Sequence, residues 1–447
     1  MKRLYFLLLL CPVLSQAQSH LTLYNLPLVP QRLAVNPAFS EHYNFYAGIP
    51  GISAVSASAG NTGFSLSKLL KRTDDDSLEL TMDAWLENAR KKTNISARTH
   101  ISILNTGFKT KIGFFDFFIN ERANFNFIVP VDYFDLAWNG ISKTGEHFDL
   151  GAALYLNHYR EYGAGYTYKF KDLFRAGIRV KYLYGLENIH TKRSDISLSS
   201  SDEMYHLTGK SDFSIKSSGI RSIANLDPSE KGAVKDYLFK KHNRGAAFDF
   251  GFYYNLKKWT FSASILDLGG IRWKDDTHHF SSRNTEEFTF RGMDIGQVLK
   301  DSLTLEEAGD RLLDSVVSYF DIDSTKGSYT SNLPLQHYGG INYHFTNRTE
   351  AGLLLYGYWL NGKLYSSATI AGTTRIKRWF SVTANYTMGY QGFNVFGAGF
   401  SLRVWKLQWY VACDNALGIF DPEGTRYVQL QTGLNMPLSI EKTPKKE

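Results

Sequence analysis

The chain has 447 residues, of which 21% are charged and 15% aromatic, and its formal net charge is +7. Its mean hydropathy of −0.27 excludes a helical membrane protein but suits a β-barrel, in which only alternate residues contact lipid. The basic residues form no cluster on one face, so no nucleic-acid partner is expected. The length allows one large barrel or two soluble domains.

The N-terminus predicts a secretory signal peptide over residues 1–17. Lys2 and Arg3 precede an apolar stretch at residues 4–10, and the small residues Ser15 and Ala17 provide a cleavage site. The apolar stretch is too short to cross a membrane as a helix. An exported chain of this kind is either a soluble protein or a barrel, and the strand pattern has to separate the two.

Residues 18–49 form an N-terminal segment that we expect in the periplasm or inside the barrel lumen. Pro27 and Pro30 argue against a central strand here. A first strand is predicted at 52–60. Within 63–92, apolar residues recur at helical spacing on both sides of three consecutive aspartates, so we expect short inserted helices there.

The middle of the chain alternates apolar residues with small or polar ones in segments of about ten residues, the length of a membrane-spanning strand. These segments lie at 96–104, 107–118, 122–130, 148–157, 159–170, 174–187, 245–255, 259–268, 335–345, 350–360 and 363–375. Together with four closing segments and with 52–60 they make sixteen strands, the count that we favour. Placing 52–60 in the lumen and dropping one doubtful early segment makes fourteen. Both even counts return the two chain ends to the same side of a membrane.

The connections differ in length on the two sides of the predicted barrel. Tight links lie on one side, at 170–173, 256–258, 346–348, 376–378 and 403–406. Long insertions lie on the other side, and the one at 293–320 places apolar residues on one helical face. Outer-membrane barrels have short periplasmic turns and longer external loops, so the tight side is predicted to face the periplasm. Trp259, Trp379 and Trp405 lie beside these links, where an aromatic girdle is expected.

The closing stretch at 380–436 has the clearest alternation, with apolar side chains on one face and polar residues or glycine on the other. We therefore expect a barrel over residues 50–436, followed by a periplasmic tail at 437–447. The polar face supplies four candidate lumen residues, which are Asn385, Arg403, Gln429 and Gln431. Gly397 and Gly399 on the same face are expected where an inner plug comes close or the strand bends.

Two groups of residues stand out as motifs. The first is Asn36-Pro37-Ala38-Phe39, and the second contains Asp267, Gly269 and Trp273. They resemble an uncharacterised family of Bacteroidota outer-membrane β-barrels, a domain of unknown function. A looser similarity, mainly in the first motif, extends to fatty-acid-transporter-like barrels and to barrels of the type IX secretion apparatus. The resemblance implies an all-β fold, a transmembrane antiparallel barrel in the outer membrane of a Gram-negative bacterium, but no activity.

The sequence contains no constellation typical of a catalytic, cofactor or metal site, so we predict that the protein is not an enzyme and needs no cofactor. The expected partners are outer-membrane lipid and either a small-molecule ligand or an envelope protein. Because small residues are abundant on the lumen faces, we predict a channel or uptake barrel for small or hydrophobic ligands. The alternative is a structural or partner-binding barrel, linked to a secretion apparatus, whose helical insertions are docking surfaces.

Overall fold

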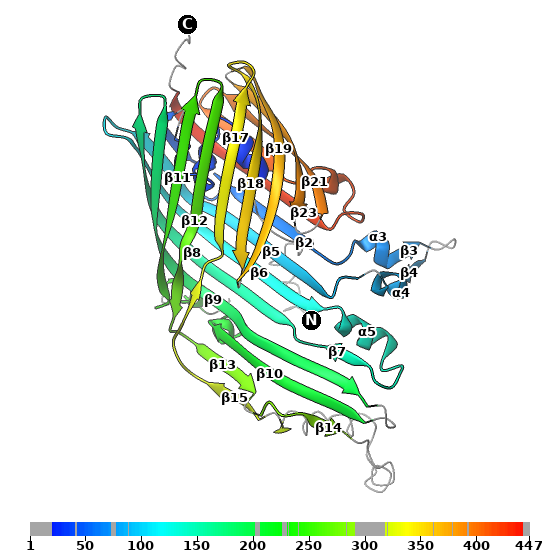
Figure 1. Cartoon of the computed structure of the whole chain (residues 1–447). Coiled ribbons are helices and arrows are strands. Elements are labelled where there is room, and N and C mark those ends of the chain that lie inside the picture. The colour runs from blue at the N-terminus through cyan, green and yellow to red at the C-terminus, as the bar shows by residue number, and fades with distance from the viewer. Residues whose placement is uncertain are drawn as a thin grey trace.

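The computed structural model describes residues 20–40, 43–72, 77–87, 89–201, 206–225, 230, 232–239, 241–282, 284–290, 318–319, 321–360, 362–377, 379–390 and 393–440. In this part of the chain, fourteen antiparallel strands close into a barrel (Figure 1). The wall consists of β1 (Tyr43–Gly48) with β2 (Val55–Asn61), β5 (Lys92–Lys109), β6 (Phe114–Pro130), β8 (Ala153–Phe170), β9 (Phe174–Ser200), β11 (Arg244–Leu256), β12 (Trp259–Trp273), β17 (Leu335–His344), β18 (Thr349–Leu360), β19 (Lys363–Lys377), β20 (Phe380–Tyr390), β21 (Phe393–Val404), β22 (Leu407–Cys413) and β23 (Tyr427–Ile440). The predicted all-β fold, an antiparallel β-barrel, is confirmed.

The favoured count of sixteen strands is wrong, and fourteen is correct. β5 and β6 pair along their whole lengths across the region predicted as three strands. β8 likewise spans two predicted segments. Its register with β6 is unbroken across His158, and the bulge at this level places its extra residue, Leu186, on β9. Polar residues such as Asn105 and Asn120 were interpreted as strand ends, whereas here they are buried within β5 and β6.

The first strand differs from its prediction at 52–60. β1 and β2 share one place in the wall, and both pair with β23 on one side and with β5 on the other. Between them, residues 49–54 lie opposite only Gly433 and Leu434, because Gly48 pairs with Asn435 and Val55 with Thr432. The wall therefore contains a large bulge at the seam where the first and last strands meet.

The other end of the chain also differs slightly. β23 continues to Ile440, so the predicted tail at 437–447 begins as strand. The remaining residues of the tail lie outside those that the structure describes.

All five tight links join neighbouring antiparallel strands, and they lie at the same end of the barrel, which we name the turn end (top of Figure 1). Trp259, Trp379 and Trp405 lie beside these turns and are exposed. The opposite end, the loop end, has longer connections. There β9 projects beyond the barrel and pairs with β10 (Leu207–Ser218), which in turn pairs with β13 (Thr277–Ser282) and β14 (Phe288–Phe290).

The remaining elements, apart from those formed by residues 20–40, also lie toward the loop end. They are α3 (Leu66–Leu69), β3 (Leu70–Arg72), β4 (Leu78–Leu80), α4 (Met82–Leu86), α5 (Asp132–Asn139), β7 (His147–Asp149), α6 (Ile220–Ala224), α7 (Ala233–Phe239), β15 (Ile322–Thr325), β16 (Tyr329–Asn332) and α10 (Leu417–Phe420). The insertion at 63–92 thus contains two short helices with a small hairpin between them. The predicted helix at 293–320 lies almost wholly outside the described residues. No helix among the described residues is long and apolar enough to cross a membrane.

Candidate functional site: a plug inside the barrel

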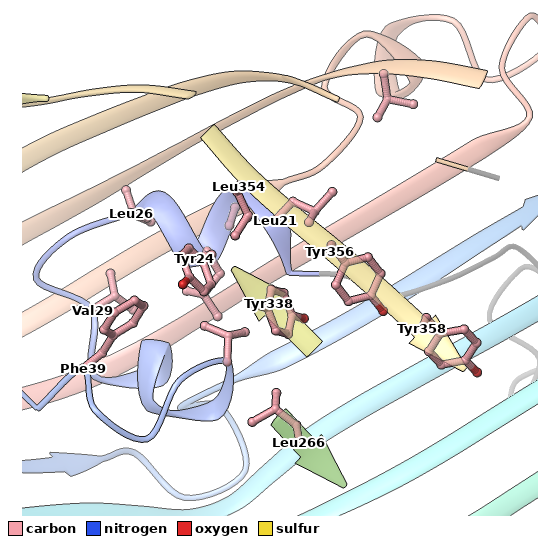
Figure 2. Close-up of a cluster of buried hydrophobic side chains, with 14 of the residues drawn as sticks. Leu21, Tyr24, Leu26, Val29, Phe39, Leu266, Tyr338, Leu354, Tyr356 and Tyr358 are labelled. Carbon is pink, nitrogen blue, oxygen red and sulfur yellow. The ribbon is translucent and has the colours of Figure 1, made fainter. Parts of the chain in front are cut away.

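Residues 20–40, which we name the plug, lie inside the barrel (Figure 2). They form the short helix α2 (Leu21–Asn25) and the 3₁₀ turn η1 (Pro30–Ala34), and nearly all of them are buried. Pro30 suits the first position of η1, because its ring fixes φ and it has no backbone donor to satisfy. The wall supplies the helix cap. The Asp414 carboxylate accepts the backbone N–H of Leu21 at 3.2 Å and of Thr22 at 2.8 Å.

Three of the four lumen candidates meet at the start of the plug. Asn385 donates from Nδ2 to Thr22 Oγ1 at 2.9 Å, and Gln431 Oε1 lies 2.7 Å from His20 Nδ1. Gln429 accepts the backbone N–H of Asp414 at 2.7 Å and so positions the residue that caps the helix. All three side chains are buried, so the polar face of the closing stretch lines a filled lumen.

Arg403, the fourth candidate, lies apart from the plug. It is half-buried at the turn end, where its guanidinium donates to the carbonyls of Trp405 and Pro437, each at 3.2 Å. Gly397 and Gly399 do approach the plug, since a Cβ on either would lie under 3.0 Å from the Thr22 side chain. That expectation is confirmed.

The motif Asn36-Pro37-Ala38-Phe39 locks the other end of the plug to the wall. Asn36 donates from Nδ2 to the carbonyls of Phe252 and Ala263, at 3.2 and 3.1 Å, and its Oδ1 accepts the Ala38 N–H at 2.9 Å. The Pro37 carbonyl accepts from Thr167 Oγ1 at 2.6 Å. The Phe39 ring packs edge-to-face on Tyr24, 5.0 Å between centroids.

Two glycines of the wall leave the space that this motif occupies. A Cβ on Gly177 would lie 2.3 Å from the Pro37 carbonyl oxygen, and a Cβ on Gly251 would lie 2.3 Å from Asn36 Oδ1. Real Cβ contacts are longer, so even alanine at Gly177 would collide with the backbone of the plug. Docking of the plug therefore requires residues without a side chain at these two positions of β9 and β11.

A row of tyrosines leads from the plug toward the loop end, and we name it the tyrosine row. Tyr338 stacks on Tyr24 of the plug at 5.4 Å between centroids, and Tyr356 lies 4.9 Å from Tyr338. Tyr358 follows two residues later on β18, and Tyr365 lies 6.4 Å from it. Figure 2 shows Tyr338, Tyr356 and Tyr358 along neighbouring strands beside α2. This side of the lumen is aromatic.

The facing wall is charged. Lys181 Nζ lies 2.7 Å from carboxylate oxygens of both Asp249 and Asp267, and 3.9 Å from Glu161. Arg122 pairs with Glu161 at 3.0 Å. These side chains come from β6, β8, β9, β11 and β12 and are buried or nearly so. In the described part of the chain, no group of three His, Cys, Asp or Glu residues is arranged to hold a metal ion.

Asp267 reaches this network through a backbone irregularity. Its φ is +63°, and the pairing register between β11 and β12 shifts beside it, between Phe248 and Phe250. Leu266 and Asp267 are consequently both buried, which strict alternation would not allow. The other two residues of this motif have packing roles: Gly269 lies against the Ala246 carbonyl, and Trp273 donates from Nε1 to Ser331 Oγ at 2.8 Å.

A depression of about 300 Å³ lies on the outside of the barrel rather than in the lumen. Its floor is Ala263 and Gly339, and larger apolar side chains such as Phe252, Ile341 and Leu355 surround it. On the inner side of the same wall, a Cβ on Gly340 would lie 3.1 Å from the Tyr24 hydroxyl. The wall is therefore thin where the plug rests against it.

Residues 37–414 match the model of a family described as a family of unknown function, DUF5723. The chain belongs to this family. The resemblance to an uncharacterised barrel family, read from the motifs, is confirmed. The DUF5723 match starts within the Asn36-Pro37-Ala38-Phe39 motif and ends at Asp414, the residue that caps the plug helix.

No curated protein matches this DUF5723 chain. Among solved structures, it is similar to a Pseudomonas aeruginosa FadL homologue, with 9% identity, a TM-score of 0.41 and coverage of 95% of this chain and 99% of that one. It is also similar to the toluene transporter TbuX of Ralstonia pickettii, with 10% identity, a TM-score of 0.38 and coverage of 92% and 94%. Values this low say nothing about the ligand of the DUF5723 chain.

Proposed function

We propose that this chain is an outer-membrane uptake barrel for small hydrophobic ligands, with the plug as its closure. The observation that supports this most is the continuity between the tyrosine row and the plug. Tyr24 stacks on Tyr338, so an apolar ligand moving along the row would reach the plug itself. Tyrosine rings offer an apolar face and a polar edge, which suits ligands that are mostly apolar with one polar group.

The outer face of the barrel supports a membrane location. Large apolar residues point outward and are exposed along the middle of several strands, and tryptophans lie at the turn end. A surface of this kind is unusual on a soluble protein, because large exposed apolar patches mark contact with lipid or protein. Aromatic girdles at the membrane interface are typical of outer-membrane barrels.

Ile370→Arg should destabilise the folded barrel, because residue 370 faces outward at the middle of β19. An arginine at the membrane midplane costs about 2–4 kcal/mol, falling to about 0–1 kcal/mol near the interface. Ile376→Arg is the matched control, since Ile376 faces outward on the same strand at the turn end. The measurement is the folded fraction by heat-modifiable migration after refolding into lipid. Equal loss of folded protein in both variants would contradict the membrane location.

Tyr356→Leu should slow uptake while leaving the barrel folded. The leucine keeps apolar bulk but removes the aromatic ring against which a ligand would pack. One aromatic pair is worth about 0.5–1.5 kcal/mol, so uptake should fall by about two- to tenfold. Tyr386→Leu is the control, because Tyr386 faces outward on β20. The assay follows entry of a fluorescent apolar solute into cells that make each variant. If the protein does not accelerate entry at all, or if both variants behave alike, the uptake proposal fails.

The alternative is a partner-binding barrel. One observation favours it: the sheet formed by β10, β13 and the projecting part of β9 extends well beyond the wall at the loop end. Such a sheet is larger than closure of a pore requires. Recovery of the same envelope protein with the intact chain, and its loss when a bulky tag is inserted after Ser201, which directly follows β9, would support this alternative.

A further inference from the structure

We infer that the outer face of β11 and β12 binds the phosphate of an anionic membrane lipid near the loop end, through Arg244 and Arg272. The inference goes beyond ligand uptake, and it rests only on the membrane location proposed above. The partner is defined by its chemistry, as a lipid with a phosphate head group and hydrocarbon chains, in the leaflet that surrounds the loop end of the barrel.

Strand register places the two arginines side by side on the outside of the barrel. Arg244 on β11 pairs directly with Arg272 on β12, so their Cβ atoms lie about 4.5–5.5 Å apart. Ile271 and Trp273, on either side of Arg272, are fully buried. Since successive side chains of a strand point to opposite faces, Arg272 and its partner point away from the lumen, and both are exposed.

No carboxylate of a described residue pairs with either arginine. Arg272 makes one long hydrogen bond, from a guanidinium nitrogen to Ser328 Oγ at 3.5 Å, and the Arg244 side chain makes none to a described residue. Like charges directly opposite each other destabilise a sheet. An anion bound by both guanidinium groups would replace this repulsion with attraction, and phosphate suits their planar donors.

The next arginine in the same row of paired residues has a partner within the chain. Tyr184 on β9 pairs with Arg244 on one side and with Arg160 of β8 on the other. Arg160 donates to the Glu121 carboxylate at 2.6 Å, and its guanidinium lies 5.0 Å from the centroid of the Phe239 ring. The described chain therefore supplies a counter-charge to this arginine and leaves the pair on β11 and β12 for a partner from outside.

The surroundings of the pair keep an excess of positive charge. Lys274 directly follows β12, is exposed, and pairs with no carboxylate of a described residue. The two acids after it bind elsewhere, because Asp275 accepts the backbone N–H of His242 and Asp276 accepts the backbone N–H and the hydroxyl of Ser222. Basic groups at a membrane surface attract anionic lipid.

The arginine pair lies one membrane thickness from the turn end. Leu256 pairs with Trp259 at the tight turn, 12 positions along β11 from Arg244. With about 3.3 Å per residue and a strand tilt of about 40°, this length covers a height of about 30 Å, the thickness of a hydrocarbon core. The outward residues between the two levels are uncharged. Arg244 and Arg272 therefore lie where lipid head groups begin.

Apolar side chains continue from the arginines toward the turn end. Phe248 pairs with Leu268 and Phe250 with Ile265, and all four are outward and exposed. A phosphate bound by the arginines would place its lipid chains along these side chains, which removes apolar surface from contact with water. Free phosphate would gain nothing from them, so a lipid is the occupant that fits both parts of the surface.

Native mass spectrometry of the purified full-length protein in detergent tests the site. The probes are dioleoyl phosphatidic acid and dioleoylglycerol, which has the same chains without the phosphate. We expect phosphatidic acid to bind at least about tenfold more tightly, since each arginine near an anionic lipid contributes about a factor of five. Equal binding of the two lipids would overturn the phosphate site. Complete displacement of phosphatidic acid by an equal concentration of inorganic phosphate would overturn the lipid as its occupant.

Two variants locate the site. Arg244→Gln and Arg272→Gln should each weaken phosphatidic acid by about fivefold, and the double variant should bind both lipids equally. Arg193→Gln is the matched control, because Arg193 lies on the projecting part of β9 and pairs with Asp212 at 2.6 Å. A folded double variant that still prefers phosphatidic acid would refute the assignment.

Two further measurements keep the result decisive. If the double variant fails to fold, the single variants and the two lipids on the unaltered chain still decide. Insertion into phosphatidylcholine vesicles, followed by heat-modifiable migration, tests the membrane location separately. A barrel that inserts but does not prefer phosphatidic acid refutes only the lipid site, whereas a barrel that does not insert refutes the membrane location as well.

Discussion

Replacing Gly177 by alanine should release the plug and open the lumen to small hydrophilic solutes. The new Cβ would lie 2.3 Å from the Pro37 carbonyl oxygen and 2.4 Å from its carbon, and a backbone contact of this kind cannot be relieved by a rotamer change. Overpacking costs about 1–3 kcal/mol, which lowers the docked fraction of the plug by about five- to hundredfold. The measurement is swelling of liposomes in sugars of graded size, together with conductance in planar bilayers.

Gly339→Ala provides the matched control for this experiment. The substitution is the same and the residue is also in a barrel strand, but nothing lies within 4 Å of a Cβ at Gly339. We expect closed, fully folded barrels from this variant. If Gly177→Ala also stays closed while its barrel is intact, the glycine does not determine docking, and the Asn36 contacts alone hold the plug.

Replacing Lys181 by methionine should destabilise the barrel severely. Its ammonium lies 2.7 Å from both Asp249 and Asp267, and the side chain is almost fully buried. Methionine fills a similar volume but leaves two buried carboxylates without their shared cation. Removing one partner of a buried ion pair typically costs about 3–5 kcal/mol. Urea denaturation of protein in lipid, followed by tryptophan fluorescence, measures the loss.

Lys210→Met is the matched control, because the same substitution removes a positive charge from an exposed ion pair. Lys210 pairs with Asp195 at 3.0 Å on an exposed part of β10, where solvent screens the pair. We expect no measurable change in unfolding. The triple variant Lys181→Met, Asp249→Asn, Asp267→Asn should recover part of the stability, because no unpaired charge remains buried. A Lys181→Met protein as stable as the unaltered chain would mean that water hydrates the network.

Alternation along the strands predicted which way side chains face, because the outer face of a barrel and its lumen select different residues. This is why Asn385, Gln429 and Gln431 were found from the sequence. Alternation carries no information about the position of a residue along the barrel axis. Arg403 was therefore predicted together with these three residues, although it lies at the turn end. Facing is a local property, whereas position along the barrel depends on where every neighbouring strand begins.

The charged network and the contact between Arg98 and Tyr358 could not be predicted in the same way. Asp267 faces the lumen only because a bulge shifts the register, whereas strict alternation assigns one of Leu266 and Asp267 to the outer face. The Arg98 guanidinium lies 4.2 Å from the centroid of the Tyr358 ring, but the two residues are 260 positions apart in the sequence and belong to opposite walls, so nothing local relates them. A usable signal did exist for Lys181 and Arg122. A charged residue on the inward face of a barrel strand has to find a partner there.

The seam of the barrel also sets the order in which the molecule can assemble. Thr22 contacts the Cys413 carbonyl across 391 positions of sequence, and β1, which directly follows the plug, pairs with the final strand. During synthesis, the N-terminal segment cannot contact these partners until the last hairpin has been made. Contacts of such separation form slowly because the intervening chain must be ordered first. The plug is thus made before the strands that hold it and is among the last parts to dock, so changes in it should affect completion of the barrel rather than its nucleation.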